Sequence, residues 1–367
     1  MTTAPDVIIV GGGVVGAACA RELAGAGHRV RLIERDAESG EAWRASVGLL
    51  SPQIDARAAD PLFELGIAGR EYWREQAPAL LESTGIDVGL WEGGILEIGA
   101  GEREVHHLKE QVAWQRQHGH RCEWLEADEI RREWPWIGVT GGALHAPQDG
   151  SLDPVLAVGA LRAEAARLGV ELLTDTVTGL TRTGGKVTGV QGRERHAAKH
   201  VVVAAGAWSG RLGNLPRPLS IEPVRGQIAA YPWPEGARPG IVVGHGAYAL
   251  HRRGEALVGS TMEHTGFDAS VTEEGLASIH ARAEKLVPSL AHAQRGRAWA
   301  GLRPGTPDGL PIIGREPNLE GLWYATGHGR HGVLLAGITG VIITHLMAGE
   351  ATFEEVGALK PERFWSW

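Results

Sequence analysis

The stretch DVIIVGGGVVGAACARELAGAGHRVRLIERD, residues 6–36, predicts how the first part of the chain folds. An apolar run from Val7 to Val10 meets Gly11, Gly13 and Gly16 in the order G-x-G-x-x-G. A helical pattern follows, and a second apolar strand comes after it. The stretch therefore predicts one complete βαβ unit of the kind that binds a dinucleotide.

Each residue type in this unit has a physical reason. Gly11 permits the tight turn, Gly13 lets the backbone approach a pyrophosphate, and Gly16 lets the helix lie close to the strand. The phosphates would lie at the helix N-terminus, where free N–H groups point. Glu34 ends the second strand and can accept hydrogen bonds from an adenosine ribose. A glycine-rich turn that binds nothing would explain the glycines but would not explain why an acid, Glu34, ends the second strand.

Composition excludes several classes of function. The 367 residues carry a formal net charge of -8 with no block of like charge, so the chain lacks the electrostatic footprint of a nucleic-acid binder. Two cysteines are too few for a disulfide framework, and no basic N-terminal segment leads into an apolar one, which favours a cytoplasmic protein. The longest apolar run, Val333 to Met347, is shorter than the roughly 20 residues of a membrane-spanning helix. We therefore expect a small-molecule ligand and no integral membrane segment.

Later apolar segments indicate that the nucleotide domain is discontinuous. HVVVAAGAWS (200–209) and LWYATG (322–327) are predicted strands of the same sheet, although they lie far apart in the sequence. The expected fold class is two-domain α/β, with a Rossmann-like parallel sheet and a smaller antiparallel-sheet substrate domain. The nucleotide domain is expected to comprise residues 1–82, 140–216 and 300–367, and the substrate domain residues 83–139 and 217–299.

The C-terminal third carries the resemblance to a known family. WAGLRPGTPDGLPIIG (299–314) and LWYATGHGRHGVLLAGITG (322–340), together with ASVGLLSP, VVVAAGAWS and YALHRRGEALVGSTMEHTGFD, are similar to the D-amino acid oxidase family of flavoproteins, and within it to the glycine oxidase branch. The resemblance covers nearly the whole chain in the same order. It implies FAD, with the isoalloxazine between the two domains and an amino acid against it. The FAD would be non-covalent, because relatives with a cysteine linkage place that cysteine late in the chain, and no cysteine follows Cys122 here.

The resemblance assigns three side chains to the substrate. Arg303 is the expected carboxylate clamp, since a planar guanidinium binds a carboxylate bidentately. Tyr248 is expected over the substrate as a second donor, and Arg330 at the edge of the site. From the residues alone, a structural ion pair for Arg303, packing for Tyr248 and a solvated position for Arg330 stay open. His328 and His331 have no acidic companion nearby in the sequence, so no metal site is predicted.

The expected FAD-binding residues come from the βαβ unit, the segment along the flavin ring, the later strands and the glycine loop before the last helix. The helix starting near Gly332 has no side chain to cap its first N–H groups, which are therefore free to stabilise negative charge near N1 and the C2 carbonyl of reduced flavin. The full set is Gly11, Gly13, Val14, Val15, Gly16, Glu34, Arg35, Ala45, Ser46, Val47, Gly48, Leu49, Val177, Ala205, Gly206, Trp208, Gly301, Arg303, His328, Gly329, Arg330, His331, Gly332, Val333 and Leu334.

The predicted activity is the oxidation of glycine, sarcosine or a small D-amino acid. The resemblance implies hydride transfer from Cα to flavin N5, hydrolysis of the imine, and reduction of O2 to H2O2. Similar glycine oxidases carry an aromatic residue where this chain has Gly329 and an asparagine where it has His331. They carry small hydroxyl residues where this chain has Trp43 and Arg44. These differences weaken the expectation of strict glycine specificity. A dehydrogenase with another acceptor, including hydrogen cyanide synthase-like chemistry, and a non-catalytic flavin-binding subunit are the alternatives. Whether the protein forms a homo-oligomer is left open.

Overall fold

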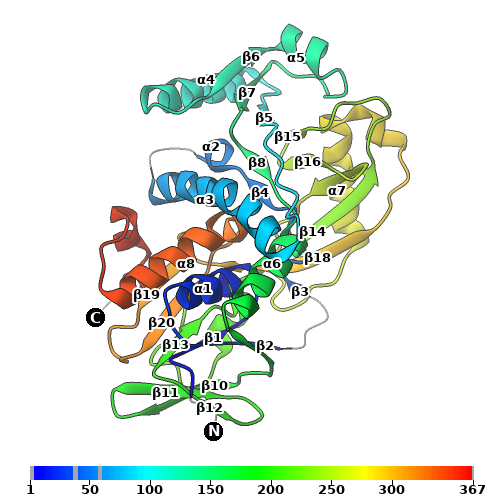
Figure 1. Cartoon of the computed structure of the whole chain (residues 1–367). Helices are drawn as coiled ribbons and strands as arrows, with labels where there is room; N and C mark the ends of the chain where they lie inside the picture. Colours follow the sequence, from blue (N-terminus) through cyan, green and yellow to red (C-terminus); the bar gives the residue numbers. More distant parts are fainter. Residues whose placement is uncertain (1–3, 36–39, 57–59, 366–367) are drawn as a thin grey trace.

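Two large β-sheets form the framework of the protein (Figure 1), which we describe from a computed structural model. The structure describes residues 4–35, 40–56 and 60–365, so Asp36 at the end of the first motif lies outside them. The parallel-containing sheet and the separate, mainly antiparallel sheet confirm the predicted α/β class.

The first sheet contains the predicted βαβ unit. Its strand order is β19-β20-β13-β1-β2-β9, and all neighbouring strands are parallel except β19, which is antiparallel to β20. Strand β1 pairs with β13, and β13 with β20, so the sheet joins segments from the two ends and the middle of the chain as predicted. The strands are β1 (Val7–Val10), β2 (Val30–Glu34), β9 (Glu171–Thr174), β13 (His200–Val203), β19 (Ile312–Arg315) and β20 (Leu322–Thr326).

Strand β1 is buried on both faces because helices cover one side of the sheet and a second small sheet covers the other. Val7 and Ile9 pack in one core with the helices, while Ile8 and Val10 pack in another core with the small sheet. A continuous apolar run is typical of such a doubly covered strand. The helices are α1 (Val14–Gly25), α6 (Pro154–Arg167) and α8 (Gly332–Ala348), and the small sheet comprises β10 (Gly179–Thr183), β11 (Lys186–Gln191) and β12 (Arg195–Ala197).

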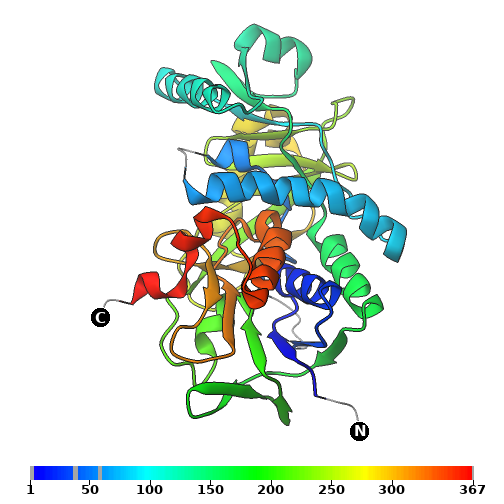
Figure 2. The same cartoon turned by 60° about the vertical axis from the view of Figure 1, so that its left-hand side comes forward.

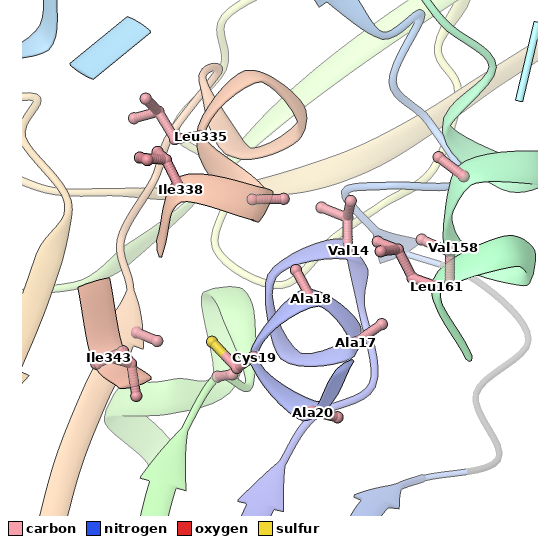
Figure 3. Close-up of a cluster of buried hydrophobic side chains, with 14 of the residues drawn as sticks. Val14, Ala17, Ala18, Cys19, Ala20, Val158, Leu161, Leu335, Ile338 and Ile343 are labelled. Atoms are coloured by element: carbon pink, nitrogen blue, oxygen red, sulfur yellow. The ribbon is translucent and has the colours of Figure 1, made fainter. Parts of the chain in front are cut away.

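Small side chains on α1 let the helices approach each other closely. Figure 3 shows Val14 beside Val158 and Leu161 of α6, and Cys19 on the side of α1 that faces α8. A Cβ atom at Gly16 would lie 1.8 Å from the carbonyl oxygen of Gly11, so only glycine fits there. The third glycine of the motif therefore serves the packing of helix against strand, as predicted.

The second sheet has nine strands in the order β3-β18-β14-β17-β16-β15-β5-β7-β6. Its neighbours are antiparallel, except that β5 is parallel to β15 and β3 is parallel to β18. The stretch YALHRRGEALVGST forms a hairpin in which β16 pairs with β17. The strands are β3 (Gly40–Glu41), β5 (Ile95–Ile98), β6 (Glu123–Glu126), β7 (Gly142–Ala146), β14 (Glu222–Pro232), β15 (Ile241–Gly244), β16 (Ala247–Arg252), β17 (Glu255–Gly259) and β18 (Ala298–Gly305).

Membership of this sheet extends beyond the residue ranges expected for the substrate domain. Strand β7 and residues 300–305 of β18 lie in ranges expected for the nucleotide domain, yet β7 pairs with β5 and β6, and β18 pairs with β14 over its whole length. Hydrogen bonding between distant segments decides this, and the local pattern of either strand does not reveal its partner. The division of the chain into two domains stays a prediction.

The nine-stranded sheet has one face covered by a helix and one face turned toward a cavity. On the first face, side chains of α7 (Glu273–Leu286) pack against those of β14, β15, β16 and β17. On the other face, residues of α4 (Glu102–Gln117) and α2 (Pro52–Asp55) join the strands in a further core. The remaining elements are β4 (Leu49–Leu50), β8 (Gly150–Ser151), α5 (Ala127–Glu133) and the short 3-10 helices η1 (Gly206–Arg211), η2 (Pro288–His292), η3 (Glu354–Leu359) and η4 (Pro361–Phe364).

Helix α3 (Pro61–Thr84) crosses between the two sheets, as the light blue helix in Figure 2 shows. Asp60 caps its start by accepting hydrogen bonds from the N–H groups of Leu62 and Phe63. Gly69 lets it approach α8, because a Cβ atom there would lie 2.4 Å from the carbonyl oxygen of Leu334. Within the described ranges, no helix has both the length and the apolar character needed to cross a membrane.

Candidate active site

Two adjoining cavities lie between the sheets and the loop that precedes α8. The larger has a volume of about 660 Å³ and the smaller about 240 Å³. Val14, Trp43, Gly329 and Gly332 line both cavities, so they form one continuous site.

The sequence-predicted residues gather around these two cavities. The larger is lined by Val14, Ala45, Ser46, Val47, Leu49, Tyr248, Gly301, Arg303, Gly329, Arg330, His331, Gly332, Val333 and Leu334. The smaller is lined by Gly11, Gly13, Val14, Val15, Glu34, Arg35, Val177, Ala205, Gly206, Trp208, His328, Gly329 and Gly332. Gly16 and Gly48 line neither, and both serve packing: Gly48 has φ +68°, and a Cβ atom there would lie 2.1 Å from the carbonyl oxygen of Leu152. Which of these residues contact a cofactor stays a prediction.

The smaller cavity has the features that a dinucleotide needs at its phosphate and ribose end. Gly11 has φ +102°, and a Cβ atom there would lie 2.5 Å from the carbonyl oxygen of Ala204. Burial raises the pKa of the Glu34 carboxyl, whose Oε2 accepts a hydrogen bond from the N–H of Gly12. Arg162 of α6 donates from Nε to the Gly12 carbonyl oxygen at 2.8 Å, and its Nη2 lies 3.9 Å from Oε2 of Glu34. The sequence analysis missed Arg162, because nothing in the pattern of α6 indicates this contact.

Arg303 is brought into the wall of the larger cavity by β18. Its Nη2 donates to the hydroxyl of Ser260 at 2.7 Å, and its Nη1 to the carbonyl oxygen of Thr261 at 3.1 Å. The guanidinium lies flat against Gly226, where a Cβ atom would be 2.1 Å from Nη1. Within the part of the chain that the structure describes, no carboxylate forms an ion pair with Arg303. Burial lowers its pKa. An arginine guanidinium nevertheless stays a cation in proteins, and this one keeps donor capacity for an anion.

Tyr248 stands beside Arg303 on the same cavity wall. It lies opposite Gly259 of β17, where a Cβ atom would lie 2.4 Å from the tyrosine hydroxyl, so the ring passes over a glycine. Burial raises the pKa of Tyr248 to about 12, even though the positive charge of Arg303 opposes the shift. The hydroxyl is therefore protonated across the working pH range and can donate a hydrogen bond.

Arg252 shares a sheet face with Tyr248 but has a structural role. Its Nη2 donates to the carbonyl oxygens of Val47 at 2.8 Å and Leu152 at 2.7 Å. The contact fixes the segment that contains Val47 against β8 and α6. Arg252 lines neither cavity, unlike Arg303.

Arg330 is paired with an acid that the sequence analysis did not find. Its Nη2 lies 2.9 Å from Oδ1 of Asp55, and Nε2 of His331 lies 3.6 Å from Oδ2 of the same carboxylate. The expectation that His331 has no acidic companion was therefore wrong, because the companion comes from α2, far away in the sequence. Within the described ranges, no three His, Cys, Asp or Glu side chains come together closely enough to hold a metal ion.

The glycine loop leads into α8 as predicted. The N-terminal residue before the helix is His331, which makes no capping hydrogen bond with its side chain, and the first turn carries no acidic residue. His328 is buried, and its Nε2 is 2.9 Å from the hydroxyl of Thr339. Burial lowers the pKa of His328 to about 3, so this imidazole is neutral. The buried imidazole of His328 therefore adds no charge, and the free N–H groups at the start of α8 supply a partial positive charge at this end of the loop.

Trp43 separates the glycine motif from the larger cavity. A Cβ atom at Gly13 would lie 3.3 Å from Cδ1 of Trp43, so the indole lies directly against the phosphate turn. The guanidinium of Arg44 lies over the Trp43 ring at 4.3 Å. Of these two departures from the glycine oxidase pattern, Trp43 lies at the junction of the two cavities, whereas Arg44 lines neither of them.

Comparison with known proteins gives a consistent result. Residues 6–346 match the DAO family, described as FAD dependent oxidoreductase. The chain is 34% identical over 359 residues to glycine oxidase of Geobacillus kaustophilus (strain HTA426), covering 96% of this chain and 95% of that protein. It is 30% identical over 401 residues to hydrogen cyanide synthase subunit HcnC of Pseudomonas aeruginosa, covering 98% and 96%. The crystal structure of glycine oxidase from Geobacillus kaustophilus is similar with a TM-score of 0.93 and 32% identity, over 99% of both chains.

The cofactor is FAD, and the site fits it. The smaller cavity offers a glycine turn at the N-terminus of α1 and the carboxylate of Glu34, and the larger offers room for a ring system beside Arg303. The family match and the identity extend over nearly the whole chain. The chain therefore belongs to the DAO family of FAD-dependent oxidoreductases and is an FAD-dependent amino acid oxidoreductase.

Proposed function

We propose that the protein oxidises glycine, sarcosine or a small D-amino acid and passes the electrons to O2. The products would be a 2-oxo acid, ammonia or an amine, and H2O2. One observation carries the proposal: Arg303 holds an unpaired guanidinium, within the described residues, in a cavity wall next to the hydroxyl of Tyr248. A cation with free donors at a partly buried position is suited to a carboxylate.

The residues of the chain bind and orient the substrate. Arg303 would hold the carboxylate, and the protonated hydroxyl of Tyr248 would donate a second hydrogen bond to it. The amine must be neutral before its Cα–H can leave as hydride, and the proton that it loses would go to water. Bound FAD supplies the hydride acceptor. The free N–H groups of α8 would stabilise negative charge on the reduced ring system, because Gly332, Val333 and Leu334 line the larger cavity.

An iminium ion would form on the substrate as the Cα–H bond breaks with its electron pair, and loss of an N–H proton to water would give the neutral imine. Water would then add to the imine carbon and expel ammonia or the amine. No side chain needs to act as general base for hydride loss from a neutral amine. The neutral His328 hydrogen-bonds to Thr339 in the core, which leaves it a packing role.

An anaerobic screen tests the substrate class. Each candidate amino acid or amine is mixed with the purified protein, and bleaching of the flavin absorbance is followed. We expect glycine, sarcosine or a small D-amino acid to bleach it fastest. If none of them reduces the flavin while a chemical reductant does, the proposed substrate class is wrong.

A second acceptor has support from one relative. The similarity to hydrogen cyanide synthase subunit HcnC favours a dehydrogenase as the alternative, with a quinone or another compound in place of O2. Peroxide formation measured beside reduction of an artificial dye separates the two. Rapid dye reduction with negligible peroxide would favour the dehydrogenase.

A further inference from the structure

Two guanidinium groups line the larger cavity, and they differ in their partners. Arg303 donates only to neutral groups among the described residues, namely the hydroxyl of Ser260, the carbonyl oxygen of Thr261 and the thioether of Met262. Arg330 faces the carboxylate of Asp55 at 2.9 Å. One cation is therefore available to a ligand and the other is neutralised by the protein.

Asp55 is held in place from both sides. The hydroxyl of Ser51 donates to its Oδ2 at 3.0 Å. The short helix α2 is itself anchored, because Asp149 accepts hydrogen bonds from the N–H groups of Gln53 at 3.0 Å and Ile54 at 3.1 Å. The partner of Arg330 is thus fixed by the buried core and not by a mobile surface side chain.

The charge state of the pair is also set by its surroundings. Burial acts to raise the pKa of Asp55, but the hydrogen bond with His331 and the charge of Arg330 outweigh it, so the pKa is lowered. The charge of Arg330 also reaches Arg303, whose pKa is lowered first by burial and then by this second cation. The charges of the two guanidinium groups therefore both contribute to the electrostatic potential inside the larger cavity.

Among the described residues, the rest of the cavity wall offers no further lysine or arginine. Besides Asp55 and Tyr248, its remaining ionisable lining residues are two acids, Glu97 and Glu104, and the histidines His107, His245 and His331. A second carboxylate on a substrate would meet acidic groups and an arginine that is already paired. A neutral or positively charged group would not meet this repulsion.

We infer that Asp55 makes the site selective for substrates with a single carboxylate: it holds Arg330 in an ion pair, so that among the described residues lining the larger cavity only the guanidinium of Arg303 is open to an anion. The inference rests on the proposed function and narrows it to monocarboxylate amino acids and amines whose remainder is neutral or cationic. Asp55 acts through Arg330 and is a specificity-determining residue without a chemical step of its own.

Sarcosine and iminodiacetate form a matched pair of substrates for the test. They differ only where the methyl group of sarcosine is replaced by carboxymethyl, which adds one carboxylate. We expect wild-type holoenzyme to favour sarcosine. Asp55→Asn keeps the shape of the side chain and frees Arg330, so the ratio of kcat/KM for iminodiacetate to that for sarcosine should rise about tenfold, the size of one hydrogen bond between charged groups. The gain should shrink in added salt, because the Arg330 side chain is 55% exposed.

The double variant Asp55→Asn with Arg330→Ala is the control. It removes the freed guanidinium, so the tenfold gain should disappear, and Arg330→Ala alone should show no gain. A gain that persists in the double variant, or a ratio unchanged in Asp55→Asn with full FAD content, would overturn the inference.

Binding of unreactive carboxylates gives a second readout that needs no turnover. Acetate and malonate are titrated into the holoenzyme, and their Kd values are obtained from the flavin absorbance change. Wild type should not favour malonate, whereas Asp55→Asn should favour it about tenfold more than wild type does. Wild-type protein that binds malonate at least tenfold more tightly than acetate contradicts the inference even if the variant does not fold. Failure of every amino acid to reduce the flavin would sink the proposed function, while these Kd values would still decide the role of Asp55.

Discussion

The arginines around the larger cavity show how a residue's partners determine its role. Arg252 is occupied by two backbone carbonyls and Arg330 by Asp55, whereas Arg303 meets only a hydroxyl, a carbonyl and a thioether. Leaving a cation with spare donors in a cavity wall is costly unless a ligand uses them. This cost is the physical reason to place the substrate carboxylate on Arg303.

Replacing Arg303 tests this placement. Arg303→Ala should lower kcat/KM for the best substrate by roughly 30-fold to several thousand-fold, because truncating one partner of a buried charge pair costs about 2 to 5 kcal/mol. Arg303→Lys should fall in between, since it keeps the charge and loses the planar fork. Steady-state kinetics with each variant give the ratios, and FAD content should not change.

Arg132→Ala on exposed α5 is the matched control and should leave kcat/KM unaffected. Near wild-type kcat/KM in Arg303→Ala with full FAD would show that Arg303 is structural.

The pH dependence of kcat/KM follows from which groups titrate. Free amino acids hold their ammonium proton well above neutrality, so kcat/KM should climb from about pH 6 to about pH 9 as the neutral amine increases. The pKa of Tyr248 is raised to about 12, so its hydroxyl stays a donor below that pH and adds no falling limb in this range. The profile is measured over that range in one buffer series. A profile that falls would point to an acid catalyst absent from the mechanism.

Gly329 tests whether the loop sets the size of the substrate. It has φ +53°, and a Cβ atom there meets nothing within 4 Å, so there is room for a side chain but backbone strain for any L residue. Gly329→Phe should shift kcat/KM toward glycine and away from sarcosine or D-alanine, if the ring fills the pocket. Gly329→Ala carries the strain without the bulk and should not shift the preference. Equal shifts in both variants, or a wild type that already accepts only glycine, would show that Gly329 does not set the size of the substrate.

The residues that the sequence predicted and those it missed differ in one respect. Gly11 and Gly13 belong to a local motif whose spacing carries chemical meaning, Arg303 belongs to a local motif that the family resemblance identifies, and all three line the cavities. Asp55 and Arg162 act through contacts with segments far away in the sequence, and their own neighbours carry no comparable pattern. Local spacing can indicate the first kind of residue only.

At the scale of elements, length decides what a pattern can predict. The strands β1, β13 and β20 are largely apolar runs and were predicted. The helix α2 has four residues and β3 has two, too few for any periodicity to show. Yet α2 presents Asp55 to the glycine loop, so an element too short to predict arranges part of the site.

The anchoring of α2 can be tested through the buried ion pair behind it. Arg70 Nη1 lies 2.8 Å from Asp149 Oδ1, and the two side chains are 5% and 0% exposed. Asp149→Asn removes the buried partner of Arg70 and leaves it only the partly exposed Glu71 at 3.0 Å. Breaking a buried pair costs up to about 3 to 5 kcal/mol, so the melting midpoint of the holoenzyme should fall by up to roughly 5–10 °C. The midpoint is measured by thermal denaturation followed by circular dichroism.

Asp128→Asn supplies the comparison, since Asp128 pairs with Arg131 on the exposed surface of α5. Exposed pairs contribute at most about 1 kcal/mol, so this variant should melt close to wild type. If the two variants lose equal stability, the Arg70–Asp149 pair does not anchor α2.

At the scale of the whole molecule, the site exists only because distant parts of the chain meet. The βαβ unit supplies the glycine turn, β16 and β18 supply Tyr248 and Arg303, and the loop before α8 closes the junction of the two cavities. Helix α3 lies between the two sheets and contacts α8, where Trp73 donates to the carbonyl of Val333 at 2.8 Å. The family resemblance could predict this assembly, because it matches motifs in order along nearly the whole chain, whereas no single segment could.

The way FAD is held is a property of this whole assembly, and its release is the last prediction. Cys19 and Cys122 are both buried and line neither cavity, and burial raises the pKa of the Cys122 thiol to about 12 and that of Cys19 further still. Neither cysteine is therefore a reactive thiolate that could attach the flavin. Acid or heat denaturation should release intact FAD into the supernatant, and chromatography against an FAD standard would identify it. Flavin that stays with the precipitated polypeptide would contradict this.

Reversible binding also makes stability depend on ligand concentration, so excess FAD at about 100 times its Kd should stabilise the protein by about 2.7 kcal/mol relative to the apoprotein. A melting midpoint that does not respond to added FAD, in protein stripped of flavin beforehand, would mean that the glycine turn and Glu34 do not form a working cofactor site by themselves.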